Sequence, residues 1–296
     1  MKSNVKQSNR KAAFTIVELL TVMSIIVILI GLLVPALSKV KQFARDVKQK
    51  AQFHSIEAAL ELFNSQFDSY PESLYSNPGD TGPSGYCGAE KLCEAMMGQD
   101  MLGYHPDSTF RSDGTDGFGH TLYYNPSTTS ARKGPFLPLE NANAYPLGHI
   151  YDTLGPFDPC DYVLCDVYKR VVSNKSGMRI GMPILYYKAN TINDLHIPDD
   201  PDNPRNIYKF GDNEPLLMLG MPWETGRIHK LLQDPDATPA EPRGKRFYWN
   251  IRNEKINISR PYRADSFILI SAGWDGEYGT SDDICNFDWR YLDTLP

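Results

Sequence analysis

The feature that most constrains this chain is a continuous apolar stretch near its N terminus, residues 14–37. The stretch, FTIVELLTVMSIIVILIGLLVPAL, has 24 residues and one charged side chain, Glu18. A helix of this length spans about 36 Å, enough to cross a bilayer with some tilt. A carboxylate is costly in hydrocarbon unless a positive charge pairs with it. The sequence therefore predicts a membrane-spanning or similarly buried helix in which Glu18 needs a partner.

A short basic segment, residues 1–13, precedes the apolar stretch. It contains Lys2, Lys6, Arg10 and Lys11 and no acidic residue. Positive flanks stay on the cytoplasmic side of a membrane, so this segment is predicted to be a cytoplasmic leader. Removing its four positive charges would change the formal net charge from −6 to −10. Such an acidic product is poorly suited to nucleic-acid binding, and no specific nucleic-acid partner is expected.

The junction KAA-FTIVELL resembles the type IV prepilin signature, which type IV pilins share with type II secretion pseudopilins. In that family a membrane peptidase cuts just before the apolar stretch and methylates the new N terminus. The resemblance implies cleavage between Ala13 and Phe14, N-methylation of Phe14, and a family role for Glu18 in assembly. Pro35 also matches a proline that many members carry. The chain departs from the signature at Ala13, where the family almost always has glycine, so slower processing is expected.

The resemblance implies a filament subunit whose Glu18 carboxylate meets the Phe14 amine of a neighbouring copy. Each charge alone is expensive in an apolar core, whereas the pair is tolerated and selects one register. The implied partners are the prepilin peptidase, copies of the chain, other pilins or pseudopilins, and an inner-membrane assembly platform. The implied location is the bacterial inner membrane, crossed once, with the C-terminal head in the periplasm or on the cell surface after assembly.

Residues 38–70 are predicted to continue the helix as an amphipathic spine. Apolar side chains recur there every three or four residues, and Pro71 ends the pattern. They are Val40, Phe43, Val47, Phe53, Ile56, Leu60, Phe63 and Phe67. Basic residues between positions 39 and 50 are interpreted as a collar that faces solvent or lipid headgroups.

Residues 71–296 are predicted to form the exported head, in which turn-forming residues are frequent. One helix is expected at residues 89–102. Strands are expected at residues 120–124, 162–172, 183–189, 247–251 and 266–271. The fold class is therefore α+β, with a long N-terminal helix packed on a small antiparallel sheet that carries large loop-rich insertions.

An acidic, glycine-rich loop at residues 271–286 follows the last predicted strand. It contains Asp275, Asp282 and Asp283 among several glycines. Clustered carboxylates on such a turn are suitable ligands for Ca²⁺, although the spacing does not match an EF-hand. The loop resembles the C-terminal calcium loop of the major type II secretion pseudopilin, which implies these three aspartates as Ca²⁺ ligands. An acidic surface turn without an ion is the alternative.

Five cysteines all lie beyond the apolar stretch. An exported chain could pair four of them, and the short spacings favour the local bridges Cys87–Cys93 and Cys160–Cys165. Cys285 would then remain unpaired. Five free or partly buried thiols are the alternative, and the sequence leaves both open.

No catalytic motif is evident: the chain contains no GxSxG, HExxH, P-loop or GxGxxG pattern. We therefore expect a structural subunit of a type II secretion pseudopilus or a type IV pilus-like filament, not an enzyme. The calcium-like loop favours secretion over adhesion or DNA uptake, and the large head favours a minor or specialised subunit. The alternative is a membrane-anchored extracytoplasmic binding module or hydrolase that uses the prepilin-type signal only for export.

Overall fold

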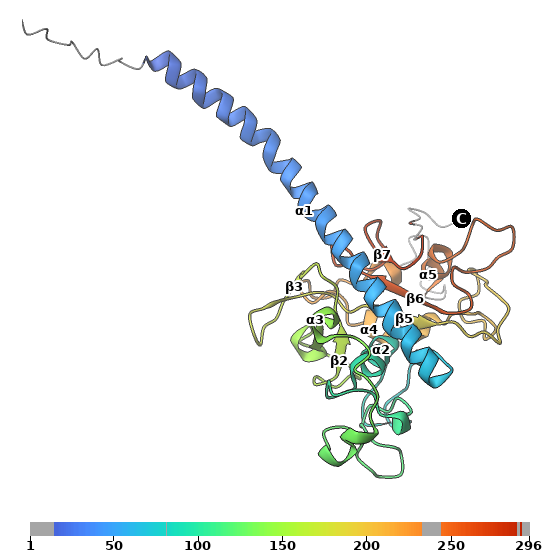
Figure 1. Cartoon of the computed structure of the whole chain (residues 1–296). Coiled ribbons are helices and arrows are strands. Elements are labelled where there is room, and N and C mark those ends of the chain that lie inside the picture. The colour runs from blue at the N-terminus through green and yellow to red at the C-terminus, as the bar shows by residue number, and fades with distance from the viewer. Residues whose placement is uncertain (1–14, 81, 233–243, 289–290, 292–296) are drawn as a thin grey trace, which may run out of the picture. The chain divides into compact units, whose positions relative to one another are not determined.

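The computed structural model describes residues 15–80, 82–232, 244–288 and 291 (Figure 1). The α-helices are α1 (Ile16–Phe67), α2 (Gly88–Met97), α3 (Leu139–Ala142), α4 (Glu214–Leu217) and α5 (Lys245–Asn250). The strands are β1 (Ala144–Pro146), β2 (Tyr162–Leu164), β3 (Val171–Val172), β4 (Arg179–Ile180), β5 (Leu185–Lys188), β6 (Phe267–Ser271) and β7 (Ile284–Cys285). Short 3₁₀ helices occupy Pro106–Ser108, Pro126–Ala131, Leu147–His149, Phe210–Asp212 and Lys230–Leu232.

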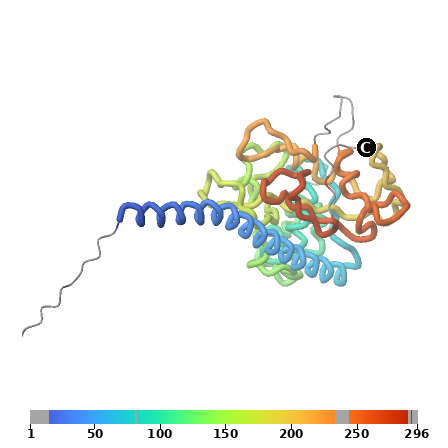
Figure 2. The backbone as a smooth tube through the Cα atoms, turned by 90° about the horizontal axis from the view of Figure 1, so that it is seen from above, coloured from blue at the N-terminus to red at the C-terminus, as the bar shows by residue number. Residues whose placement is uncertain are grey.

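The chain divides into two compact units, one ending at Ala44 and the other beginning at Arg45, and α1 runs through the boundary. We call residues 45–296 the globular unit. Figure 2 shows that most of this unit winds as loops around few regular elements. The mixture of helices and small antiparallel sheets confirms the predicted α+β class.

The C-terminal part of α1 contributes one face to the core of the globular unit. Phe53, Ile56, Leu60 and Phe63 are at most 3% exposed, and their spacing of three or four residues places them on one side of the helix. The earlier members of the predicted stripe differ, because Val40, Phe43 and Val47 are all more than half exposed. The amphipathic spine is therefore buried only from about Gln49 onward.

The main sheet has the order β5-β6-β7 and is antiparallel throughout, with Leu185 opposite Ile270 and Ser271 opposite Ile284. Alternate residues of a strand point to opposite faces, and here both faces are covered. Ile268 and Ile270 of β6 pack in the cluster that includes α5, whereas Phe267 and Leu269 pack in the cluster that includes α1 and α2. This double burial explains why all five residues of β6 are inaccessible to solvent.

The free edge of β5 is covered by polar side chains. Asn213 donates from its side-chain nitrogen to the Tyr186 carbonyl (2.7 Å) and accepts from the Ala89 N–H at the start of α2 (2.9 Å). Ser73 accepts from the Lys188 N–H (2.9 Å). Satisfying these backbone groups closes an edge that could otherwise pair with another strand.

Two of the predicted strands are wrong. Residues 120–124 form a loop because the Asp116 carboxylate accepts the N–H groups of Phe118 and His120, and Tyr124 has a positive φ of 57°. Residues 247–251 lie in and just after α5. Phe247, Tyr248 and Ile251 are aromatic or β-branched, which favours strands, but burying them together on one helical face overrides that preference.

The other predicted elements are present with different limits. The helix expected at 89–102 is α2 and ends at Met97, because Gly98 has a positive φ of 76°. The strand expected at 162–172 is divided into β2 and β3. Between them, Cys165 forms an isolated antiparallel bridge with Pro183, and the Val167 N–H donates to Gln49 Oε1 of α1 (3.0 Å), so regular strand pairing is interrupted. The expected strands at 183–189 and 266–271 correspond to β5 and β6.

Candidate functional site

The apolar part of α1 is the first candidate site. Its side chains are exposed over the whole length, from Ile16 at 81% through Leu32 at 70% to Leu37 at 49%. Among the described residues it is the one helix long and apolar enough to cross a membrane. Exposed apolar surface of this extent requires a cover of lipid or protein, because water is an unfavourable solvent for it.

Glu18 lies in the first turn of α1 and forms a capping box with Thr15. The Thr15 N–H and hydroxyl donate to Glu18 Oε2 (2.9 and 2.7 Å), and the Glu18 N–H donates to the Thr15 hydroxyl (3.2 Å). Such reciprocal bonds satisfy backbone donors at a helix start. This capping role was not predicted from the sequence, although the T-x-x-E pattern of Thr15 and Glu18 is typical of a capping box. The predicted cleavage residues, Ala13 and Phe14, lie outside the described residues.

Pro35 lies inside α1, and the helix continues through it from Ile16 to Phe67. A proline has no N–H to donate and its ring crowds the preceding turn, so one helical hydrogen bond is missing at this point. The helix is therefore continuous but locally weaker at Pro35.

The three predicted calcium ligands all lie in the acidic loop between β6 and β7, where each of them accepts a backbone hydrogen bond. The Asp275 N–H donates to Asp282 Oδ2 (2.9 Å), and the Gly279 N–H donates to Asp283 Oδ2 (2.7 Å). Gly273 has a φ of +64°, and a Cβ there would lie 2.2 Å from the Asp282 carbonyl oxygen. Only glycine therefore permits this tight return of the chain.

Two carboxyl groups of the loop, those of Asp275 and Asp283, have raised pKa values. Burial, together with the neighbouring charge of Asp282, raises the pKa of Asp275 from 3.8 to about 6. Burial also holds the pKa of Asp283 well above its ordinary value. A bound cation would favour the ionised forms of both groups.

The aspartates accept hydrogen bonds from their own loop, which stabilise the turn. The Thr280 hydroxyl donates to Asp282 Oδ1 (2.6 Å) and the Glu277 N–H donates to Asp275 Oδ1 (2.8 Å). Among the described residues, no group of three or more His, Cys, Asp or Glu side chains is arranged to hold a metal ion. Calcium binding at Asp275, Asp282 and Asp283 therefore stays a prediction.

Polar contacts attach α1 to the segment that follows β2. Gln52 Nε2 donates to the Cys165 carbonyl (3.0 Å), the Arg45 guanidinium donates to the Tyr168 carbonyl (3.2 Å), and the Tyr168 hydroxyl donates to Asp46 (2.8 Å). The Arg45 guanidinium also lies 4.7 Å from the centre of the Trp274 ring, beside the acidic loop. These contacts were not predicted from the sequence, because the residues that they join are more than 100 positions apart.

All five cysteines are free thiols in the structure. Cys87, the N-cap residue of α2, and Cys93, inside α2, pack in different core clusters. Cys160 is exposed while Cys165 is buried. The structure therefore corresponds to the free-thiol alternative, and neither local bridge is present.

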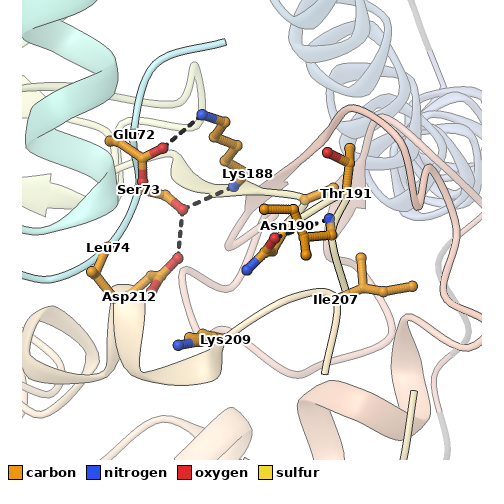
Figure 3. A pocket seen from close by; sticks show the side chains of 11 residues that line it. Glu72, Ser73, Leu74, Lys188, Asn190, Thr191, Ile207, Lys209 and Asp212 are labelled. Carbon is orange, nitrogen blue, oxygen red and sulfur yellow. Dashed lines mark hydrogen bonds and ion pairs between the residues drawn. The ribbon is translucent and has the colours of Figure 1, made fainter. Parts of the chain in front are cut away.

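A cleft of about 300 Å³ lies beside the end of β5 (Figure 3). Ser73 donates to Asp212 Oδ2 (2.5 Å) and Lys188 Nζ donates to Glu72 (2.6 Å). Burial raises the pKa of Asp212 from 3.8 to about 7. Ser73 is 2% exposed and also accepts the Lys188 N–H, so its hydroxyl supports the edge of β5.

Comparison with family models, with curated protein sequences and with solved structures gives no significant match.

Proposed function

We propose that this chain is a structural subunit of a type II secretion pseudopilus or a type IV pilus-like filament. In this proposal the precursor is stored in a membrane through residues 14–37, cut between Ala13 and Phe14, and assembled through α1. The observation that carries the proposal is the exposure of every described side chain in the apolar part of α1. Lipid would cover this apolar surface while the chain is in the membrane. Copies of the same helix would cover it in the filament.

In the proposed filament, Glu18 fixes the register between neighbouring copies of α1. Its Oε2 accepts two hydrogen bonds from Thr15, and the carboxylate keeps further acceptor positions for a cationic partner. In a filament the partner would be the amine of Phe14 in the next copy. In a plain membrane anchor the carboxylate could cap the helix through Thr15, but its charge would be costly at this depth because no cationic partner offsets it.

Replacing Glu18 with Ala tests the proposal against the anchored-module alternative. A filament subunit carrying Glu18→Ala should still be cut at Ala13 but should assemble poorly, as measured by sedimentation of sheared filaments. Glu61→Ala, a change at an exposed glutamate on the same helix, is the control and should assemble normally. Normal assembly of the Glu18→Ala chain would contradict the proposed role of the carboxylate.

A further inference from the structure

A small β-hairpin of the globular unit concentrates positive charge. It consists of β3 and β4, paired antiparallel, and it extends from the body of the unit at the left of Figure 1. Residues 169–180 contain Lys169, Arg170, Lys175 and Arg179 and no acidic residue. All four of these side chains belong to exposed residues, and Lys169, Lys175 and Arg179 form no ion pair within the described part of the chain.

The hairpin also exposes apolar side chains on a defined backbone. Val172 and Met178 are 51% and 50% exposed. The Ser173 N–H donates to the Met178 carbonyl (2.9 Å), and the Gly177 N–H donates to the Ser173 carbonyl (2.8 Å), so the turn is internally bonded. Basic side chains interspersed with exposed apolar ones are typical of segments that lie in a membrane interface.

The charge of the hairpin is opposite to that of the unit that carries it. The first 44 residues contain six basic and one acidic side chain, which leaves −11 for residues 45–296 out of the chain's total of −6. Acidic groups do lie close to the hairpin. Asp152 accepts a hydrogen bond from Asn174 (2.7 Å), and Arg170 stacks over Trp223 beside Gly276 of the acidic loop. Lys175 and Arg179 are exposed and lie in the turn and second strand of the hairpin, although the Lys175 ammonium also lies beside Gly148 of the same unit.

We propose that this hairpin docks on anionic lipid headgroups of the leaflet that faces the globular unit while the chain is held in the membrane. Arg45 follows Leu37 by eight residues, so even a fully extended connection keeps the start of the unit within about 29 Å of the end of the span. Lys169, at the base of the hairpin, lines a cleft together with Lys48 of α1, near the start of the unit. Tethering makes docking effectively intramolecular.

The alternative anion is the acidic surface of a second copy. Lipid is favoured for two reasons. The exposed Val172 and Met178 side chains can enter the apolar part of a membrane interface. The short connection between Leu37 and Arg45 also keeps the start of the globular unit near the bilayer. Each Lys or Arg near an anionic surface strengthens attachment by about fivefold. The inference rests on the proposed membrane anchoring and adds a second, reversible contact to it.

Hydrogen exchange of the full chain in nanodiscs tests the inference. With phosphatidylglycerol added to phosphatidylcholine, the amides of residues 173–178 should exchange several-fold more slowly than in phosphatidylcholine alone. The slowing should disappear in about 1 M salt, where the Debye length is about 3 Å. The double variant Lys175→Gln/Arg179→Gln should lose it, whereas the matched control Lys133→Gln/Lys209→Gln, with two exposed lysines outside the hairpin, should keep it.

Three other results of the exchange experiment would contradict headgroup docking, each for a different reason. Equal exchange in the two lipids would overturn headgroup docking while leaving the filament proposal intact. Slowing that appears in phosphatidylcholine alone and grows with the number of chains in each disc would assign the hairpin to a second copy. A chain that does not enter nanodiscs at all would contradict the membrane anchoring on which the docking depends.

Discussion

At the scale of single residues, Glu18 combines two roles that can be separated. Its carboxylate completes the first turn of α1 through Thr15, and the proposed assembly needs its negative charge. An amide side chain can still accept the Thr15 bonds, because glutamine also serves in a capping box. The charge, however, is lost with it.

Glu18→Gln should therefore behave differently from a helix-capping mutation. If the charge pairs with a neighbouring amine, Glu18→Gln and Glu18→Ala should reduce filament yield to a similar extent. The measurement is pelleted filament mass at equal levels of processed protein. If the glutamine variant assembled fully and only the alanine variant lost filament yield, Glu18 would act only as a helix cap.

The acidic loop gives a second prediction at this scale. If Asp275, Asp282 and Asp283 bind Ca²⁺ in the range of about 10⁻⁴–10⁻³ M typical of extracellular modules, millimolar Ca²⁺ should raise the Tm of the chain by a few degrees. Differential scanning calorimetry with and without Ca²⁺ measures this. Asp282→Asn should abolish the shift while keeping an acceptor for the Asp275 N–H. An unchanged Tm in the original chain would show that the carboxylates serve only the turn.

At the scale of elements, one face of the C-terminal part of α1 is buried in the globular unit, whereas the rest of the helix is mostly exposed. Leu60 is fully buried in the cluster shared with α2 and β6, whereas Leu62, two residues later, is 58% exposed. The two leucines therefore form a matched pair for measuring what the packed face contributes.

Leu60→Ala should lower the free energy of unfolding by about 2–5 kcal/mol, because it leaves a cavity beneath the sheet. Leu62→Ala should change it by less than about 0.5 kcal/mol. Urea denaturation of both variants in the same detergent gives the comparison. Equal effects would mean that the face of α1 assigned to the core is wrong.

The elements that could be predicted from the sequence are those whose apolar residues follow a regular spacing along a short segment of the chain. The apolar run of α1 and the strand at 266–271 are visible because apolar residues there follow each other continuously or at helical spacing. The docking of Gln49 and Gln52 was not predictable in this way, since their partners Val167 and Cys165 lie more than 100 residues away. The helix α5 was missed because aromatic residues in a short segment favour strands until tertiary packing decides.

At the scale of the whole molecule, buried carboxyl groups predict a pH dependence. Burial raises the pKa of Asp166 to about 7, that of Asp212 to about 7 and that of Asp161 to about 8, from ordinary values of 3.8. The folded state therefore binds these protons more tightly than the unfolded state. Their contribution to stability is complete below about pH 4 and is lost as the pH rises through 7 to 8.

Asp166→Asn isolates one of these groups. The variant mimics the protonated carboxyl: its amide oxygen can accept the Tyr168 N–H, and its amide nitrogen can donate to the Ser271 hydroxyl in place of the bond that the hydroxyl now donates. Its stability relative to the original chain should rise by about 2–4 kcal/mol between pH 4 and pH 8. Asp107→Asn, at a side chain that is 76% exposed, is the control and should show no such trend in urea denaturation at the two pH values. A constant difference for Asp166→Asn would contradict the raised pKa.

The central claim is that the chain is a processed filament subunit, and mass spectrometry of its mature N terminus tests this most directly. The proposal predicts a chain that begins at Phe14, carries a methyl group on its amine, and retains Glu18 in the same N-terminal peptide. A chain that keeps Met1 and the basic leader, or one cut beyond Leu37 as an ordinary signal peptide would be, would contradict it.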